Sequence, residues 1–325
     1  MKKIIFSVFI ILVYYFFFNS LIFFFSYLSM INGKVYKLNF INVIQKSIYC
    51  KGGFRSIWQN KKECVKFDQY LLYVPKIGNC SFDNIEFKTN LNFDKYNRIH
   101  KSFLDTNKDE NGIAVLGDSY AMGWGVNDNQ TYSSILEKKI NRKVFNQGVS
   151  SYGTIRQVKK FINSDIKDKT KKIIIHYSLN DLSENNNLDI NKVYDKESSN
   201  LIFKNKKIDL FWILRQWKRS FRLIFNEIKK KIINNKSDIV IVDLNNHFSK
   251  VESILKKNKI FNNKKIIILF IKEPKMTVVD NLKKSPNKNI EYLILDLNKD
   301  NFFIVDDHLN VLGHQTIAEL IADKL

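Results

Sequence analysis

The chain begins with a long stretch that carries no charge, from Ile4 to Gly33. Because a helix rises about 1.5 Å per residue, this stretch exceeds the roughly 20 residues needed to cross the hydrocarbon core of a bilayer. A cleavable signal peptide has a shorter apolar core, about 7–15 residues, and small residues at its cleavage site. Neither feature is present, so we expect residues 1–30 to form an uncleaved transmembrane anchor.

The charges around the anchor give its orientation only in part. Lys2 and Lys3 favour a cytoplasmic N-terminus, but Lys34, Lys37 and Lys46 follow closely on the other side. Long domains cross membranes largely regardless of their charge. We therefore expect a single-pass membrane protein whose N-terminus is cytoplasmic and whose body lies on the periplasmic, extracytoplasmic side.

Residues 31–110 are rich in aromatic residues and lysine and show no sustained period. We expect them to form a juxtamembrane lead-in that packs on the main domain. Within it, the residue types at 71–76 and 85–89 predict two short strands, separated by a turn at Gly78 and Asn79.

The chain has three cysteines, Cys50, Cys64 and Cys80. Their spacing matches no metal site. In an oxidising compartment Cys64 and Cys80 are the favoured pair, which would leave one thiol over. Three unpaired thiols are the alternative.

From residue 111 onward, short apolar runs alternate with amphipathic segments. The runs predict strands at 113–116, 144–146, 172–177, 266–271 and 292–297, and the segments between them predict helices at 133–140, 155–164, 248–257 and 311–325. Strands that are buried on both faces and alternate with helices are typical of an α/β sandwich with a mostly parallel sheet. We expect residues 111–325 to form this domain.

Residues 183–262 interrupt the alternation, and we interpret them as an insertion or a cap. They include a basic amphipathic helix near 211–231 with an aromatic face. Three roles are compatible with this pattern: the helix buries its aromatic face on the domain, lies on a membrane surface, or caps a substrate cleft.

Four blocks of the domain carry chemical groups. They are Gly117–Asp118–Ser119, Asn146–Gln147–Gly148, Ser178–Leu179–Asn180 and Asp306–Asp307–His308. The first three directly follow predicted strands, and the carboxyl ends of parallel strands meet at one edge of a sheet. Taken singly, Ser119 is compatible with a helix N-cap, Gly148 and Asn180 with turns, and His308 with a surface histidine.

Together the four blocks resemble the SGNH (GDSL-type) hydrolase superfamily, over about residues 110–325. The resemblance implies a flavodoxin-like three-layer α/β/α fold and the hydrolysis or transfer of ester-linked acyl groups. It implies Ser119 as the nucleophile and His308 as the base that accepts its proton. The backbone N–H groups of Ser119 and Gly148 and the side-chain amide of Asn180 would form the oxyanion hole.

The fourth block departs from the family pattern. The family places an aspartate three residues before the histidine, and Val305 stands there. Asp306 stands two residues before His308, an arrangement that is similar to some membrane-linked relatives acting on polysaccharides. We assign Asp306 to orient the imidazole, with Asp307 as the alternative. We interpret Asp118 as a turn-forming side chain, and His176 and His314 as buried structural residues.

The leading hypothesis is thus a membrane-anchored serine esterase or O-acyltransferase that acts on ester-linked acyl groups, with acetyl groups favoured, of a small molecule or of cell-surface carbohydrate. A lipase or thioesterase with the same site and a non-catalytic binding protein with the same fold are the alternatives. The net charge is +21, but the lysines are spread along the whole chain, so we expect no nucleic-acid partner. We also expect no cofactor and no metal.

Overall fold

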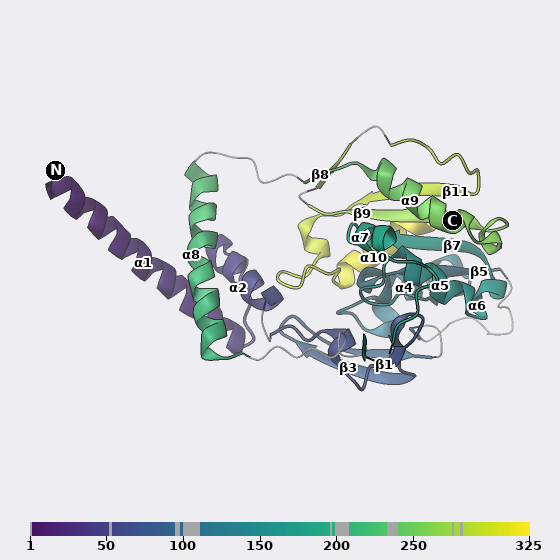
Figure 1. The fold of residues 1–325 in the computed structure, drawn as a ribbon, viewed down its shortest axis with the longest axis horizontal. Coiled ribbons are helices and arrows are strands. Elements are labelled where there is room, and N and C mark those ends of the chain that lie inside the picture. The colour runs from purple at the N-terminus through teal and green to yellow at the C-terminus, as the bar shows by residue number, and fades with distance from the viewer. Residues whose placement is uncertain are drawn as a thin grey trace.

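The computed structural model describes residues 2–51, 54–94, 98–99, 111–195, 197–198, 208–232, 240–274, 276–279 and 282–325. A long N-terminal helix, α1 (Lys2–Ile31), projects from a rounded body (Figure 1). It is the one helix in these ranges that is long and apolar enough to cross a membrane. The predicted boundaries of the three segments, 1–30, 31–110 and 111–325, stay predictions.

The body is built on a parallel sheet with the strand order β11-β9-β7-β5-β6. Its strands are β5 (Gly112–Gly117), β6 (Val144–Asn146), β7 (Thr170–Tyr177), β9 (Lys265–Lys272) and β11 (Ile290–Asp296). Renumbered along the chain, this is the flavodoxin-like order 2-1-3-4-5. The prediction of a parallel α/β sheet is confirmed.

Helices cover both faces of the sheet, which gives three layers (Figure 1). The helices are α4 (Tyr132–Ile140), α5 (Thr154–Ile162), α6 (Ile166–Lys169), α9 (Leu244–Lys256) and α10 (Val311–Ala322). One core joins alternate strand residues such as Ile175 to α5, α6 and α9. The other joins the intervening residues, such as Ile174, to α4 and α10. Successive side chains of each strand face opposite sides of the sheet, so each strand contributes to both cores, as in sheets that are buried on both faces.

The ends of some elements differ from the predicted ones. Helix α9 begins at Leu244, four residues before the predicted start, because the Asp243 side chain caps the N–H of Asn245. A short strand, β8 (Val240–Val242), pairs in parallel with β10 (Met276–Val278). Neither strand was predicted, since three-residue runs give little signal. Helix α7 (Asp181–Asn187) follows β7 directly.

The lead-in forms two antiparallel hairpins, β1 (Val65–Asp68) with β2 (Leu72–Pro75) and β3 (Gly78–Asn84) with β4 (Phe87–Phe93). The predicted turn at Gly78 and Asn79 is wrong, since both residues lie in β3, where Gly78 pairs with Phe93. The turn lies at residues 85–86 instead. The hairpins share a core with Met122 and Trp124 of the sheet domain.

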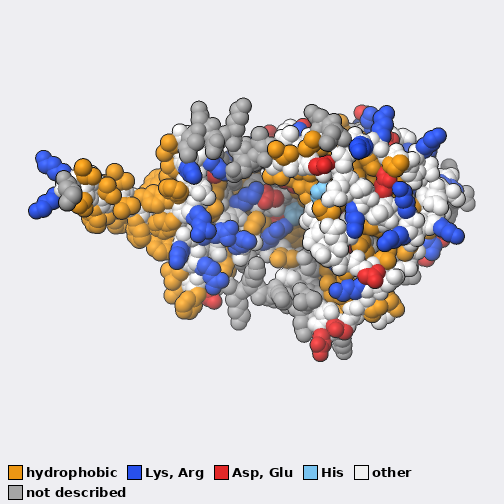
Figure 2. Space-filling model, turned by 45° about the horizontal axis from the view of Figure 1, so that its top comes forward, with side chains coloured by type: hydrophobic (Ala, Val, Ile, Leu, Met, Phe, Trp, Pro, Cys, Tyr) orange, Lys and Arg blue, Asp and Glu red, His pale blue; other side chains and the backbone are white. Residues whose placement is uncertain are grey.

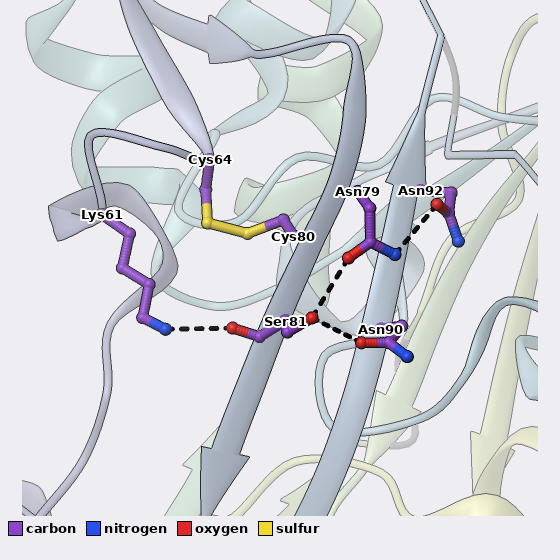
Figure 3. The surroundings of a disulfide bond; sticks show 7 residues. All are labelled: Lys61, Cys64, Asn79, Cys80, Ser81, Asn90 and Asn92. Carbon is purple, nitrogen blue, oxygen red and sulfur yellow. Dashed lines mark hydrogen bonds between the residues drawn. A yellow bond between two sulfur atoms is a disulfide. The ribbon is translucent and has the colours of Figure 1, made fainter.

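Cys64 and Cys80 form a disulfide that joins the two hairpins, with a Cα–Cα distance of 5.4 Å (Figure 3). Cys50 is the free cysteine. Around the bridge, Ser81 Oγ donates to Asn90 Oδ1 at 2.6 Å, and Lys61 Nζ donates to the Ser81 carbonyl at 3.0 Å. The pair favoured by the sequence is therefore the one that the structure contains.

Two further helices pack against α1, namely α2 (Asn39–Lys51) and α8 (Leu210–Ile232), and Figure 1 shows them between the projecting helix and the sheet domain. They share a core that includes Phe23, Ile48 and Ile224. Val305, next to the fourth sequence block, belongs to the same core. The α1–α2–α8 unit, called the anchor unit below, therefore contacts the loop that carries His308.

Candidate active site

Ser119 lies where the interior strand β5 turns into the short helix α3 (Ser119–Met122). Asp118 caps this helix, because its Oδ1 accepts a 2.9 Å hydrogen bond from the Tyr120 N–H. The interpretation of Asp118 as a turn-forming side chain is therefore confirmed. As the first helical residue, Ser119 has a backbone N–H without an acceptor inside the helix.

The glycine before this turn is needed for close packing. A Cβ on Gly117 would lie 2.5 Å from the Ala121 Cβ and 2.9 Å from the His176 Cβ. Its φ of +157° is also one that residues with a side chain rarely adopt. The Gly-Asp-Ser sequence thus lets α3 start directly above the neighbouring strand β7.

His308 connects Ser119 to Asp306. Its Nε2 lies 2.8 Å from Ser119 Oγ, and its Nδ1 contacts Asp306 Oδ1. Because an ionised carboxylate only accepts hydrogen bonds, this contact assigns the ring proton to Nδ1 and leaves the Nε2 lone pair facing the serine. The structure brings Ser119, His308 and Asp306 together in the arrangement of a catalytic triad.

The two-residue spacing of Asp306 and His308 depends on the backbone between them. Asp307 has a φ of +67°, in the left-handed region, which aspartate tolerates better than most residues. With the chain turned at this point, both the side chain and the carbonyl of Asp306 face His308 Nδ1. The Asp307 side chain pairs instead with Lys46 of α2.

Asp306 is held from outside the sheet domain. Tyr49 of α2 donates a 2.5 Å hydrogen bond to its Oδ2, and Arg55 Nε lies 3.5 Å from the same oxygen. Burial alone would raise the pKa of the Asp306 carboxyl, but His308, Arg55 and Tyr49 outweigh burial and lower that pKa to about 2. The carboxylate is therefore ionised at neutral pH although it is buried.

The backbone before Asp306 is fixed by Glu86, which stands in the turn between β3 and β4. Its carboxylate accepts hydrogen bonds from the N–H groups of Ile304, Val305 and Asp306, at 2.7, 2.8 and 2.9 Å. Burial raises the pKa of Glu86, while these three N–H groups lower it in part. Since one carboxylate serves three consecutive donors, the loop has a single well-defined conformation.

The two other residues expected in the oxyanion hole follow the strands on either side of β5. Gly148 comes after β6, and a Cβ there would lie 2.3 Å from the Met122 N, so only glycine fits. Its N–H donates to Asn146 Oδ1 at 3.1 Å and is therefore occupied within the chain. Asn180 comes after β7, is exposed and does not cap α7 with its side chain, so its amide is free to contact a ligand.

A cleft of about 970 Å³ lies between the anchor unit and the loop that carries His308, and none of Ser119, Asp306 and His308 lines it. Lys46, Glu86, Glu273 and Asp307 contribute to its lining. Tyr120 reaches toward it, since its hydroxyl lies 3.2 Å from Glu273 Oε1 and donates to the Asp307 carbonyl at 2.8 Å. Tyr120, next to Ser119, therefore contacts a residue that lines the cleft, and Asp307, next to His308, lines it directly.

His176 of β7 and His314 of α10 are both buried in the sheet domain. Burial lowers the pKa of His176 and of His314 to about 3, so both are neutral. His314 Nδ1 accepts the N–H of Tyr132 at 3.2 Å. Both are buried, as predicted. Within the described ranges, no group of three or more His, Cys, Asp or Glu side chains is placed to hold a metal ion.

Sequence reasoning missed Tyr49, Arg55 and Glu86. All three come from the lead-in, more than 200 residues before Asp306. No local pattern marks them, because their role depends on contacts between distant segments. The one available signal was the unusual D-x-H spacing, which indicated that the support of His308 would differ from the family pattern.

No family model and no curated protein matches the chain. Among solved structures, it is similar to a putative lipolytic protein of the G-D-S-L family from Desulfitobacterium hafniense DCB-2. The two share 13% identity with a TM-score of 0.36, over 66% of this chain and 100% of that chain. It is also similar to an acetyl xylan esterase, Est2A, from the rumen bacterium Butyrivibrio proteoclasticus, with 13% identity and a TM-score of 0.35, over 73% of this chain and 66% of that chain.

The first of these proteins carries the name of the family that the four sequence blocks resemble. Similarity at this level says nothing of activity. What this chain can do chemically is therefore inferred from its own residues.

Proposed function

We propose that the protein is a serine esterase or O-acyltransferase that acts on ester-linked acyl groups. The observation that carries the proposal is the contact of His308 with Ser119 Oγ at 2.8 Å on one side and with Asp306 on the other. A serine needs such a base to become nucleophilic at neutral pH. The conjunction of these residues at the carboxyl edge of the sheet favours an enzyme over a binding protein with the same fold.

The reaction begins when Ser119 Oγ attacks the carbonyl carbon of the ester and its proton passes to His308 Nε2. Asp306 stabilises the imidazolium that forms, and the imidazolium then protonates the leaving alcohol. The Ser119 N–H and the Asn180 amide would stabilise the oxyanion, each donor contributing about 2.7–4 kcal/mol. Gly148 would join them once its N–H is released from Asn146. Water or a second hydroxyl then attacks the acyl-enzyme.

The acyl group and its acceptor are a finer proposal. We infer acetyl esters of carbohydrate at the cell surface, on two grounds. The D-x-H spacing is similar to that of membrane-linked relatives acting on polysaccharides, and α1 could anchor the site at a membrane with its body on the extracytoplasmic side. Release of acetate from an acetylated polysaccharide by the full-length protein, measured against release from a short-chain triglyceride, separates this substrate class from a lipase.

The activity itself is tested with the full-length protein in detergent, using p-nitrophenyl acetate and a fluorophosphonate probe. We expect turnover and covalent labelling by the unchanged protein. Ser119→Ala should lose the labelling and roughly a thousandfold or more of the turnover. Ser183→Ala, an exposed serine on α7, is the matched control and should keep both. Near-zero turnover and no labelling in all three proteins would sink the enzyme proposal.

A further inference from the structure

Helix α8 presents three different faces, and the first of them is buried. Trp212, Gln216, Ser220 and Ile224 recur every four residues and therefore lie on one side of the helix. This side packs on the anchor helix, where Ser220 Oγ donates to Asn19 Oδ1 at 2.7 Å. The helix is thus fixed against α1 and cannot turn its other faces inward.

The second face is apolar and exposed. At 3.6 residues per turn its residues project within a sector of about 100° around the helix, and Phe211 and Ile232 are 76% and 78% exposed. The exposed apolar side chains of this helix are Leu210, Phe211, Leu214, Phe225 and Ile232. Together they form a stripe on one side of the helix, interrupted between Leu214 and Phe225, which we call the apolar stripe. An exposed apolar surface of this length indicates a site that contacts a membrane or another protein.

The third face is basic and runs beside the apolar stripe. Its exposed side chains are Arg215, Lys218, Arg219, Arg222 and Lys229. None of these five forms an ion pair with the part of the chain that the structure describes. Figure 2 shows Lys and Arg side chains gathered where the apolar helix α1 meets the rest of the molecule. A basic stripe next to an apolar one is the pattern of helices that lie in a membrane interface.

The position of α8 along α1 supplies an independent reason. The two helices cross where Tyr15 OH donates to the Phe221 carbonyl at 2.6 Å and Trp217 Nε1 donates to Ser20 Oγ at 3.2 Å. Exposed apolar side chains of α1 lie on both sides of this crossing, with Leu12 on one side and Leu21 on the other at 59% and 70% exposed. If α1 crosses a bilayer, the crossing point therefore lies within its hydrocarbon core or at the boundary of that core.

We propose that α8 lies in the plane of the membrane that α1 enters, with the apolar stripe among the acyl chains and the basic stripe on anionic lipid headgroups. In Figure 1 α8 runs across the long axis of the molecule, as an in-plane helix would. Such helices are buried to a depth of about 5–10 Å. The bound surface is therefore the phosphate and acyl boundary of an anionic bilayer.

The test uses the full-length protein in nanodiscs, with Cys50→Ser as the background so that the disulfide remains. Single cysteines replace Phe225 on the apolar stripe, Phe9 in α1 and Ser253 on the exposed side of α9, and each carries an environment-sensitive fluorophore. Discs contain phosphatidylcholine alone or with phosphatidylglycerol, together with a lipid that bears a doxyl quencher. We expect the labels at 9 and 225 to be quenched several times more than the label at 253, and the label at 225 most strongly in anionic discs.

A charge comparison completes the test. Arg215→Gln/Arg219→Gln/Arg222→Gln should reduce quenching at position 225 in anionic discs, whereas the control Lys283→Gln/Lys284→Gln/Lys288→Gln should leave it unchanged. The proposal is overturned if the label at 225 is as little quenched as that at 253. The apolar stripe would then be exposed to water or would serve to bind another protein. Equal quenching in both lipids, or an unaffected triple-glutamine variant, also contradicts it. If the label at position 9 is not quenched, α1 is not a membrane anchor and the proposal also fails. None of these outcomes bears on the esterase proposal, which has its own test.

Discussion

Tyr49 donates a 2.5 Å hydrogen bond to Asp306, which joins the first helix after the apolar α1 to the acid of the triad. Lys46, one turn earlier on the same helix, pairs with Asp307. The site is therefore not a property of the sheet domain alone. Part of its support comes from the anchor unit, and this relationship makes several predictions testable.

Removing the hydroxyl of Tyr49 should weaken catalysis and leave the fold intact. In Tyr49→Phe, Asp306 loses a donor that stabilises its charge, and hydrogen bonds to charged groups contribute about 1.5–3 kcal/mol. We expect a loss of roughly tenfold in kcat, since 1.4 kcal/mol corresponds to a factor of ten. Tyr36→Phe, in the segment between α1 and α2, is the matched control. Equal kcat values for the two variants would show that the hydrogen bond has no catalytic role.

The carboxylate of Glu86 should be needed both for stability and for rate. Glu86→Gln provides one acceptor oxygen in place of two and turns an amide N–H₂ toward backbone donors. Because at least one of the donors at 304–306 then lacks a partner, the free energy of unfolding should fall by about 1–3 kcal/mol, and kcat should fall with it. Denaturant unfolding and turnover of the full chain in detergent measure the two effects. Glu63→Gln, at an exposed position, should change neither quantity.

Backbone conformation at residue 307 should decide whether the triad forms. Asp307→Asn and Asp307→Val both remove the charge that pairs with Lys46. Asparagine accepts the left-handed conformation, whereas a β-branched residue at the φ of +67° is strained by about 1–2 kcal/mol or more. We therefore expect the asparagine variant to keep most of its fluorophosphonate labelling and the valine variant to lose it. Similar labelling of both would mean that the turn does not position His308.

Stability should depend on the ionisation of Asp306 in a defined pH window. Its pKa in the folded protein is about 2, below the value of about 3.9 for an unfolded aspartate. The ionised carboxylate therefore stabilises the fold above about pH 4, and this stabilisation is lost as the pH falls toward 2. Between pH 5 and 2 the unfolding free energy should fall by about 2 kcal/mol more than that of Asp306→Asn. Parallel pH profiles for the two proteins would contradict the lowered pKa.

The sequence alone was enough to predict the parts of the site that depend on local pattern. Ser119, Gly148 and Asn180 each follow an apolar strand, so their common edge could be inferred from the parallel sheet. Asp306 could be chosen over Asp307 only from its spacing to His308. The reason for that spacing, a left-handed residue between them, is visible only in the backbone.

What could not be predicted depends on contacts between distant segments. Tyr49 and Glu86 lie in a region without periodicity, and nothing near them in the chain indicates a partner 257 or 218 residues away. Gly78 was misinterpreted as a turn residue because glycine usually ends strands. Pairing with Phe93 decided its conformation instead.

The contact between Asn19 and Ser220 has a consequence for how the enzyme would meet its substrates. A polar side chain inside an apolar helix sets the rotation of that helix, because any other rotation leaves the amide without its partner. If α1 crosses a bilayer as proposed, this contact would hold the body at one fixed distance from the membrane surface. Only esters at that distance would then come within range of Ser119.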